Sequence, residues 1–347
     1  MKTPTQRAAT NGREIADALV KWYKASHRDL PWRRTTDPYA IWVSEIMLQQ
    51  TRVEVVVAHY ERFVARYPNV HALAGAPVED VLFAWSGLGY YRRARQLHAA
   101  AAEVVKDHKG ELPSDDARLQ KLPGIGRYTA GAIRSIAFGK AAPIVDGNVE
   151  RVLSRVYALR GAPGEAALES KLWTLAAELV PAREASAFNQ GLMELGATVC
   201  LPRAPKCPKC PLAKMCKAHA RHTEESYPQV KARKPTEKHD LGAWIVRDPR
   251  GHVLMRKRAE GEHNAGFWEL PTFDAKPPSP VAALAPERTA LGTFRHSILE
   301  RTYLVVVESA ELDAPKAAPR GYSWVESGPD GSSAWTTLTR KALALTI

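Results

Sequence analysis

All four cysteines of this chain fall within one segment of 17 residues, at Cys200, Cys207, Cys210 and Cys216. Thiolates that converge from one short loop supply a tetrahedral set of ligands, so this spacing favours a metal site over disulfides. Zinc and an iron–sulfur cluster both accept four thiolates, and the spacing leaves the two open. The stretch from Thr198 to Lys217 also carries five Lys or Arg and no carboxylate. These cations could offset the thiolate charge and face phosphates, or serve solubility alone.

Two carboxylates stand in unlike settings. Glu45 lies early in an expected helix among apolar neighbours, where burial would raise its pKa and let it hold a proton near neutral pH. Asp146 precedes an apolar helical face at Val149, Val152, Leu153 and Val156, where it would cap the helix as an anion. One protonated and one ionised carboxyl group form the pair that cleaves glycosidic bonds. The plainer alternatives are a surface glutamate with a salt-bridge partner and a helix cap with no further role.

A third feature is the segment 119–138, which places Leu-Pro-Gly-Ile-Gly between two helical patterns. Two glycines permit a tight turn with exposed backbone N–H groups, and such a hairpin can hold a DNA phosphate without reading sequence. The basic neighbours Lys121, Arg127 and Arg134 favour phosphate binding. Any helix-turn-helix connection could nevertheless carry two glycines.

The elements that must position these groups follow from apolar periodicity. From about residue 37 to 220 the apolar residues recur at helical spacing, with short Gly and Pro breaks. The polar segment 218–240 is expected to be a linker. Beyond it, short β-rich runs predict a mixed-sheet domain. The predicted fold class is therefore a multidomain α plus α/β protein, with a helical domain over 1–217, the linker 218–240 and a sheet domain over 241–347.

Composition and charge narrow the function. The 347 residues include 45% hydrophobic and 25% charged residues, which favours a packed globular protein. The net charge is +12, and residues 241–347 hold 13 Lys/Arg against 12 Asp/Glu, so the excess lies in the first two thirds. A polyanion such as nucleic acid is the natural partner for that part, although a merely basic surface is the alternative. We see no membrane-spanning run and no secretory signal, and expect a cytoplasmic, nucleoid-associated protein.

Taken together, several motifs resemble the helix-hairpin-helix DNA glycosylases, and most closely the adenine DNA glycosylases of the MutY type. In chain order they are Leu30-Pro-Trp-Arg33, Ser44-Glu-Ile-Met-Leu-Gln-Gln-Thr51, Gly87-Leu-Gly-Tyr-Tyr-Arg92, Leu122-Pro-Gly-Ile-Gly-Arg-Tyr-Thr129, Val145-Asp-Gly-Asn-Val149 and the cysteine loop. They cover about residues 15–217 in the order that the family has. The resemblance implies excision of adenine mispaired with 8-oxoguanine or guanine, from a nucleoside flipped out of duplex DNA.

By this resemblance Glu45 would protonate the departing adenine and Asp146 would stabilise the oxocarbenium ion, or capture it transiently, before water attacks. Tyr128 and Asn148 would position these groups and the water. The cysteines would bind a structural, DNA-binding [4Fe–4S] cluster over 200–216. The adenine pocket and the DNA contacts would involve Arg28, Trp32, Arg33, Leu48, Gln50, Thr51, Tyr90, Gln190, and the hairpin residues Leu122, Gly124 and Gly126.

Departures from related patterns refine these expectations. Endonuclease III-like enzymes carry a lysine that forms a Schiff base with the sugar where this chain has Tyr128, which predicts a monofunctional glycosylase. The C-terminal part resembles a Nudix-like domain but lacks the acidic box that holds Mg²⁺, so recognition is favoured over nucleotide hydrolysis. Relatives read 8-oxoguanine with a Phe-Ser-His turn, for which His296 and Ser297 are the nearest candidates here.

Two alternatives stay open at this point. One is an endonuclease III-like glycosylase and lyase that acts on oxidised pyrimidines. The other is a metal-stabilised DNA-binding module whose carboxylates are only structural. The main expectation is a monomeric adenine glycosylase that acts on duplex DNA with an adenine:8-oxoguanine or adenine:guanine mispair.

Overall fold

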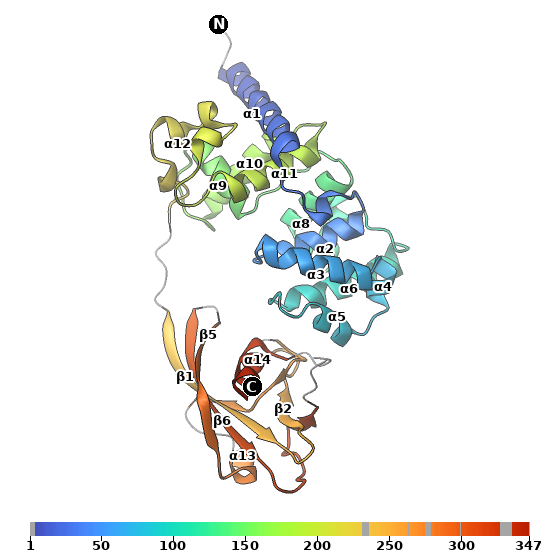
Figure 1. Cartoon of the computed structure of the whole chain (residues 1–347). Helices are drawn as coiled ribbons and strands as arrows, with labels where there is room; N and C mark the ends of the chain where they lie inside the picture. Colours follow the sequence, from blue (N-terminus) through green and yellow to red (C-terminus); the bar gives the residue numbers. More distant parts are fainter. Residues whose placement is uncertain are drawn as a thin grey trace. The chain divides into compact units, whose positions relative to one another are not determined.

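The structure, a computed structural model, describes residues 4–230, 236–262, 264–274, 279–298, 300–326 and 335–346. Its contacts divide the chain into two units (Figure 1). The helical unit comprises Met1–Ala76 and Arg95–Ala232, and the sheet unit comprises Pro77–Ala94 and Arg233–Ile347. Within the described residues, no helix combines the length and the apolar character that crossing a membrane requires.

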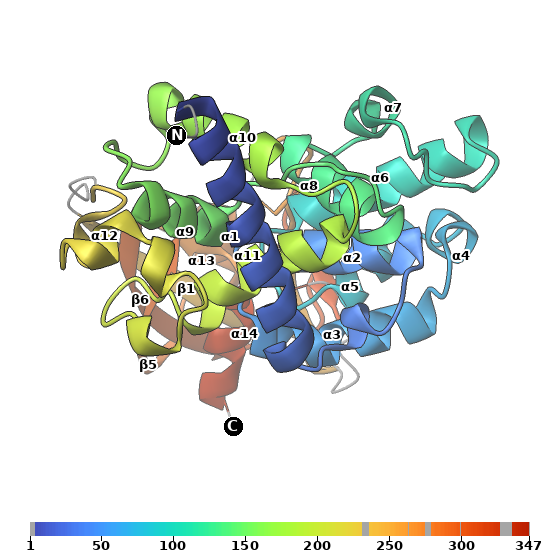
Figure 2. The ribbon, with the colours of Figure 1, turned by 90° about the horizontal axis from the view of Figure 1, so that it is seen from above.

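Helices make up the first unit, and the longest, α1, crosses α11 (Figure 2). In chain order the elements are α1 (Pro4–Ser26), η1 (Pro31–Arg33), α2 (Pro38–Leu48), α3 (Val53–Arg66), α4 (Val70–Ala74), α6 (Arg92–Asp107, which begins in the other unit), α7 (Asp116–Lys121), α8 (Arg127–Ala132), the π-helical turn η2 (Ile133–Ala137), α9 (Gly147–Tyr157), α10 (Ala166–Leu179) and α11 (Ala185–Thr198). The cysteine loop adds η3 (Cys207–Lys209), η4 (Ala213–Met215), α12 (Lys217–Ala220) and η5 (Glu224–Ser226).

Local sequence explains where the two site helices begin. Asp37 accepts hydrogen bonds from the N–H groups of Tyr39 and Ala40, and Pro38 occupies the first position of α2. Asp146 caps α9 by accepting from the N–H of Val149, as its spacing predicts. The apolar face of α9 packs into one core with α1, α10 and α11. This core fixes the start of α9, and therefore Asp146, relative to the other helices.

The segment 119–138 forms the predicted hairpin between α7 and α8. Gly124 has φ +76°, and a Cβ there would lie 2.8 Å from the Cβ of Gln96. The turn therefore requires glycine for both its backbone conformation and its close approach to α6. Leu122 is 2% exposed and packs inside, so its side chain is not available to DNA. A DNA contact of Leu122 through its backbone stays a prediction.

A mixed sheet forms the core of the second unit, as predicted. Its order is β3-β2-β1-β6-β5, with β4 paired to β1 and β7 paired to β2. β1 and β6 run parallel, and β5 pairs antiparallel with β6, beside which it lies in Figure 1. The strands are β1 (Glu237–Arg247), β2 (Val253–Lys257), β3 (Trp268–Glu269), β4 (Thr272–Phe273), β5 (Thr289–Ile298), β6 (Arg301–Glu311) and β7 (Ser323–Val325).

Alternation along β1 sends its buried side chains to both faces of the sheet. Ala243 and Ile245 pack with α14 (Thr337–Leu343), whereas Trp244 and Val246 pack with α13 (Ser279–Leu284). The sheet unit also includes α5 (Val78–Ala84), and η6 (Ala344–Thr346) follows α14. One helix on each face of the sheet gives the α/β layering that the short β-rich runs predicted.

The domain boundaries differ from those expected. Part of the predicted linker 218–240 folds against the helical unit, because Arg155 donates to the Tyr227 carbonyl (3.1 Å) and Gln229 donates its N–H to the Gly161 carbonyl (3.0 Å). β1 begins at Glu237, still inside that predicted linker. The expected helical domain also included 77–94, which groups with the sheet unit, where the Tyr91 and Phe267 rings lie 4.0 Å apart. Neither arrangement follows from local polarity or helical periodicity.

Candidate active site and cysteine loop

A cavity of about 820 Å³ opens in the helical unit between α2, α8, α11 and the start of α9. Its lining includes all four residues expected to do chemistry, Glu45, Tyr128, Asp146 and Asn148. Most of the expected pocket residues also line it, namely Arg28, Trp32, Arg33, Leu48, Gln50, Thr51, Gly124, Gly126 and Gln190. The structure therefore brings together residues that lie up to about 160 positions apart in the chain.

Glu45 lies on α2, where the side chains from Tyr39 to Met47 are all buried. Its own exposure is 4%, and burial raises its pKa to about 7 although a hydrogen bond from Tyr128 opposes the rise. The Tyr128 hydroxyl donates to Oε2 of Glu45 at 2.6 Å. The apolar setting of Glu45 in the sequence thus correctly predicted a buried carboxyl group that holds a proton near neutral pH.

Tyr128 lies on α8 and presents its hydroxyl to the same cavity. Burial raises its pKa well above the ordinary value, and the nearby Glu45 and Asp146 add to the effect. The phenol is therefore neutral at physiological pH, and its O–H can donate to the ionised Glu45 or to the carbonyl oxygen of the protonated one. Its oxygen also lies 3.2 Å from the Met193 sulfur on α11, a contact that the sequence did not suggest.

Asp146 combines its capping role with a place in the cavity. Its Oδ1 accepts from the Val149 N–H at 2.7 Å and its Oδ2 accepts from the Asn148 side-chain amide at 3.0 Å. Burial raises its pKa, whereas these donors and the nearby Arg151 charge favour the ionised form. Asp146 therefore has more hydrogen-bond donors to its ionised form than Glu45, which has a single hydroxyl donor.

Arg151 connects this corner of the cavity to the cysteine loop. It donates to the Asn148 side-chain oxygen at 2.8 Å, to the Gly196 carbonyl at 2.7 Å and to the Cys200 carbonyl at 2.8 Å. A Cβ at Gly196 would lie 2.5 Å from the Cβ of Asn148, so only glycine lets α9 and α11 approach here. Sequence reasoning missed Arg151, because its contacts with Gly196 and Cys200 lie far away in the chain.

A buried ion network forms another wall of the cavity. Glu194 on α11 is 1% exposed and accepts from Arg28 at 2.8 Å and from Arg33 at 2.8 Å. Burial would raise its pKa, but these hydrogen bonds outweigh burial and lower it to about 2. The sequence analysis named both arginines as ligand contacts but missed Glu194. An acid within an apolar helical run was the available signal, as it was for Glu45.

The other expected pocket residues take several positions. Trp32 is buried, with its ring edge-on to Tyr60 at 5.4 Å, so it supports the wall more than it reaches a ligand. Gln50 is exposed at φ 55°, and Gln190 donates to the Ser186 hydroxyl at 3.1 Å. Tyr90 lies in the 77–94 segment of the sheet unit and is 47% exposed.

His296 and Ser297 lie at the end of β5, where the chain turns into β6. The hydroxyl groups of Ser297 and Thr302 are 2.9 Å apart across this hairpin. Burial lowers the pKa of His296, and the Lys341 charge adds to the effect. His296 is thus neutral at physiological pH, and a neutral imidazole can both donate and accept a hydrogen bond.

The four cysteines form no disulfide with one another and line one small cavity beside α9 and α11. The buried Arg155 holds this loop by donating to the carbonyls of Leu201 (2.6 Å) and Pro202 (2.9 Å), and its Nη1 lies 3.3 Å from Cys200 Sγ. Backbone N–H groups also face Cys210 and Cys216. Converging sulfurs, N–H donors and a buried cation are the surroundings that suit a metal–thiolate centre.

Comparison with known proteins places the chain among DNA repair enzymes. Residues 43–178 match the family described as HhH-GPD superfamily base excision DNA repair protein. The human adenine DNA glycosylase is 33% identical over 93% of this chain and 72% of that protein. The adenine DNA glycosylase of Buchnera aphidicola (subsp. Acyrthosiphon pisum) is 38% identical over 76% of this chain and 75% of that protein.

Solved structures agree with the fold of the helical unit. A thermostable thymine-DNA glycosylase is 32% identical with a TM-score of 0.55, and the match covers 61% of this chain and 98% of that one. Endonuclease III in a non-covalent DNA complex is 27% identical with a TM-score of 0.52, covering 64% of this chain and 99% of that one. Both matches extend over nearly the whole of the matched chains.

Proposed function

Because the chain belongs to the adenine DNA glycosylase family and removes adenine from DNA in base excision repair, we propose that Glu45 and Asp146 cleave the N-glycosidic bond. The observation that carries this proposal is the pairing, in one cavity, of two buried carboxyl groups with unequal numbers of hydrogen-bond donors. One group is buried with a single hydroxyl donor, and the other caps a helix. Such a difference in environment separates the acid from the anion in glycoside-cleaving sites.

Glu45 acts as the general acid. With a pKa of about 7 it is substantially protonated at neutral pH, and it donates this proton to the departing adenine, at N7. The C1′–N9 bond then breaks with its electron pair leaving on the base. Protonation lowers the cost of that negative charge, which is what general acid catalysis contributes.

Asp146 stabilises the oxocarbenium ion that forms at the sugar, or bonds transiently to C1′, until water adds there and loses a proton to the carboxylates. The Val149 N–H and the Asn148 amide hold both of its oxygens, so the anion is oriented before the substrate enters. Tyr128 orients Glu45 through its 2.6 Å hydrogen bond. Asn148 in turn is held by Arg151.

The reaction ends at an abasic site. A lyase of this superfamily needs an amine that forms a Schiff base with the sugar, and no lysine is among the described residues that line the cavity. Tyr128 occupies the hairpin position where the lyases have that lysine, and its neutral phenol cannot replace an amine. A monofunctional glycosylase is therefore favoured over the endonuclease III-like alternative.

The substrate is duplex DNA with adenine opposite 8-oxoguanine or guanine. The hairpin glycines and the basic cysteine loop would hold backbone phosphates, and His296 and Ser297 at the β5–β6 hairpin would inspect the opposite base. The sheet unit, which resembles a Nudix-like domain, would serve this recognition. We further propose that the protein acts as a monomer in the nucleoid of the cytoplasm.

A [4Fe–4S] cluster is the cofactor that the cysteine loop fits best. Among the described residues, Cys207 alone of the four cysteines belongs to a group of three possible ligands within 4.8 Å of one another, and its partners there are His219 and Glu224. All four cysteines line one small cavity, with Arg155 beside Cys200 and backbone N–H groups facing Cys210 and Cys216. Together with the family resemblance these surroundings favour a cluster, which when bound would tie the loop to α9 and take no part in hydrolysis.

Single-turnover base release tests the proposal on duplexes that differ only in the partner of adenine: 8-oxoguanine, guanine or thymine. Strand breaks are read before and after alkali. Release opposite 8-oxoguanine with breaks only after alkali is the expected result. The Asp146→Asn and Glu45→Gln proteins should bind the same duplexes and release no adenine, whereas unchanged release would refute both roles. Breaks before alkali with a borohydride-trapped adduct would refute the monofunctional assignment.

A further inference from the structure

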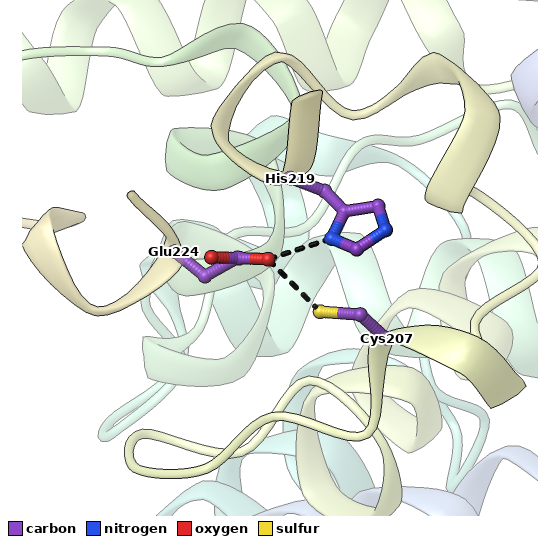
Figure 3. A group of neighbouring side chains, drawn as sticks. All are labelled: Cys207, His219 and Glu224. Carbon is purple, nitrogen blue, oxygen red and sulfur yellow. Dashed lines mark hydrogen bonds and ion pairs between the residues drawn. The ribbon is translucent and has the colours of Figure 1, made fainter. Parts of the chain in front are cut away.

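The four cysteines have unequal electrostatic surroundings. The guanidinium of Arg155 lies 3.3 Å from Cys200 Sγ, which favours negative charge on that sulfur. Cys207 Sγ instead lies 3.5 Å from Oε1 of Glu224. Figure 3 shows one oxygen of this carboxylate facing both the sulfur and the ring of His219. One side of the loop therefore faces a cation and another faces an anion.

A second contact holds the Glu224 side chain beside Cys207. Its Oε1 also accepts from Nδ1 of His219 at 2.6 Å, and because a carboxylate can only accept, Nδ1 carries the proton. His219 lies on α12 and Glu224 begins η5, so both follow the last cysteine closely. The side chain of Glu224 is only 18% exposed in this position. The imidazole therefore anchors the carboxylate against the sulfur.

Metal binding changes the character of this contact. A free Cys207 thiol can donate its S–H to Glu224, but a cysteine that binds iron does so as the thiolate and has lost that proton. The anchored carboxylate then faces a negative sulfur without a proton between them. Charge and hydrogen bonds around the sulfurs are among the features that set the reduction potential of an iron–sulfur cluster.

We propose that Glu224, held in place by His219, is a positioning residue that lowers the reduction potential of the cluster through its charge beside Cys207. An added electron is disfavoured by a nearby anion, and Arg155 at Cys200 acts in the opposite sense. Neither Glu224 nor Arg155 belongs to the sequence motifs of the cysteine loop. This inference rests on the proposed [4Fe–4S] cluster, so the cluster is established first, by iron and sulfide content and by visible absorbance of the full-length protein.

Voltammetry of the cluster-loaded protein tests the proposal. Glu224→Gln removes the charge and keeps the size, and its midpoint potential should shift to a less negative value with unchanged iron and sulfide content. Glu225→Gln is the matched control, because Glu225 is the next residue and its carboxylate accepts the Ala204 N–H at 2.7 Å instead. This control removes the same charge from the same short helix, and its potential should stay close to that of the unmodified protein.

His219→Phe tests the anchoring. Without its donor the carboxylate is free to turn toward solvent, so the potential should shift in the same direction as in Glu224→Gln. The double variant should shift no further than Glu224→Gln alone, since both changes remove one interaction. Equal potentials in Glu224→Gln and Glu225→Gln, additive shifts in the double variant, or loss of iron from Glu224→Gln would each overturn the proposal. Absence of iron and sulfide from every protein, including the unmodified one, would instead refute the cluster.

Discussion

Replacing Tyr128 with phenylalanine removes the hydrogen-bond donor of the buried Glu45 carboxylate and hardly changes the volume of the side chain. The Tyr128 hydroxyl lies 2.6 Å from Oε2 and favours the ionised form, which opposes the effect of burial. Without this donor the ionised form loses stabilisation, so the pKa of Glu45 must rise above its value of about 7. A hydrogen bond to a charged group contributes about 1.5–3 kcal/mol, and about 1.4 kcal/mol corresponds to one pKa unit. The expected rise is therefore about one to two units.

Single-turnover adenine release measured across pH reads this shift directly. If protonated Glu45 is the general acid, the rate falls as pH rises through its pKa, near 7 in the unmodified protein. In Tyr128→Phe this alkaline fall should move up by about one to two units. The pH at which the rate falls reports the pKa of Glu45, whereas the maximum rate also depends on how well Glu45 is oriented.

A matched control separates this effect from a general effect of losing a phenol. Tyr157, on α9, is half-buried outside the cavity and contacts Lys217, so Tyr157→Phe should leave the pH profile unchanged. Glu45→Gln should abolish the profile together with the activity. An alkaline fall that stays in place or moves to lower pH in Tyr128→Phe would show that the titrating acid is not Glu45, or that Tyr128 does not stabilise its anion.

Three further predictions concern stability and DNA binding. The pKa of Glu45 is about 7 in the folded protein against an ordinary 4.5. Ionisation of Glu45 should therefore lower the free energy of unfolding by on the order of 3 kcal/mol as pH rises from below the lower value to above the higher one. Glu45→Gln should therefore be more stable than the unmodified protein at pH 8.5 and equal to it at pH 4, by urea unfolding. Glu194→Ala should lower the free energy of unfolding by about 3–5 kcal/mol, because Arg33 is left buried without its anion. Glu184→Ala, which removes an exposed ion pair, should lower it by less than about 1 kcal/mol. Similar losses in the two variants would contradict a stabilising role of the buried ion network. The affinity of the full chain for DNA should fall on the order of tenfold or more between 50 and 200 mM salt if several phosphates are bound. An affinity that does not change with salt would exclude phosphate contacts by the basic side chains of the helical unit.

Several features of this protein are determined by local sequence. The cap at Asp146 and the apolar face of α9 are both encoded within a dozen residues, and both were predicted correctly. The burial of Glu45 follows from neighbours that are almost all apolar. The hairpin glycines and the cysteine spacing are equally local, because a turn or a metal loop closes on itself. The mixed sheet also follows from the short β-rich runs, although its parallel β1–β6 pairing does not.

Only the tertiary structure decided how these pieces meet. Tyr128 reaches Glu45 across 83 positions, and Glu194 reaches Arg28 across 166. No periodicity or spacing reports such pairs, because each depends on how helices distant in the chain pack against each other. The same holds for Arg151, whose contacts with the Gly196 and Cys200 carbonyls require the close approach of α9 and α11 at Gly196. Local sequence indicated that Glu45 would keep its proton, and packing decided which side chains meet it in the cavity.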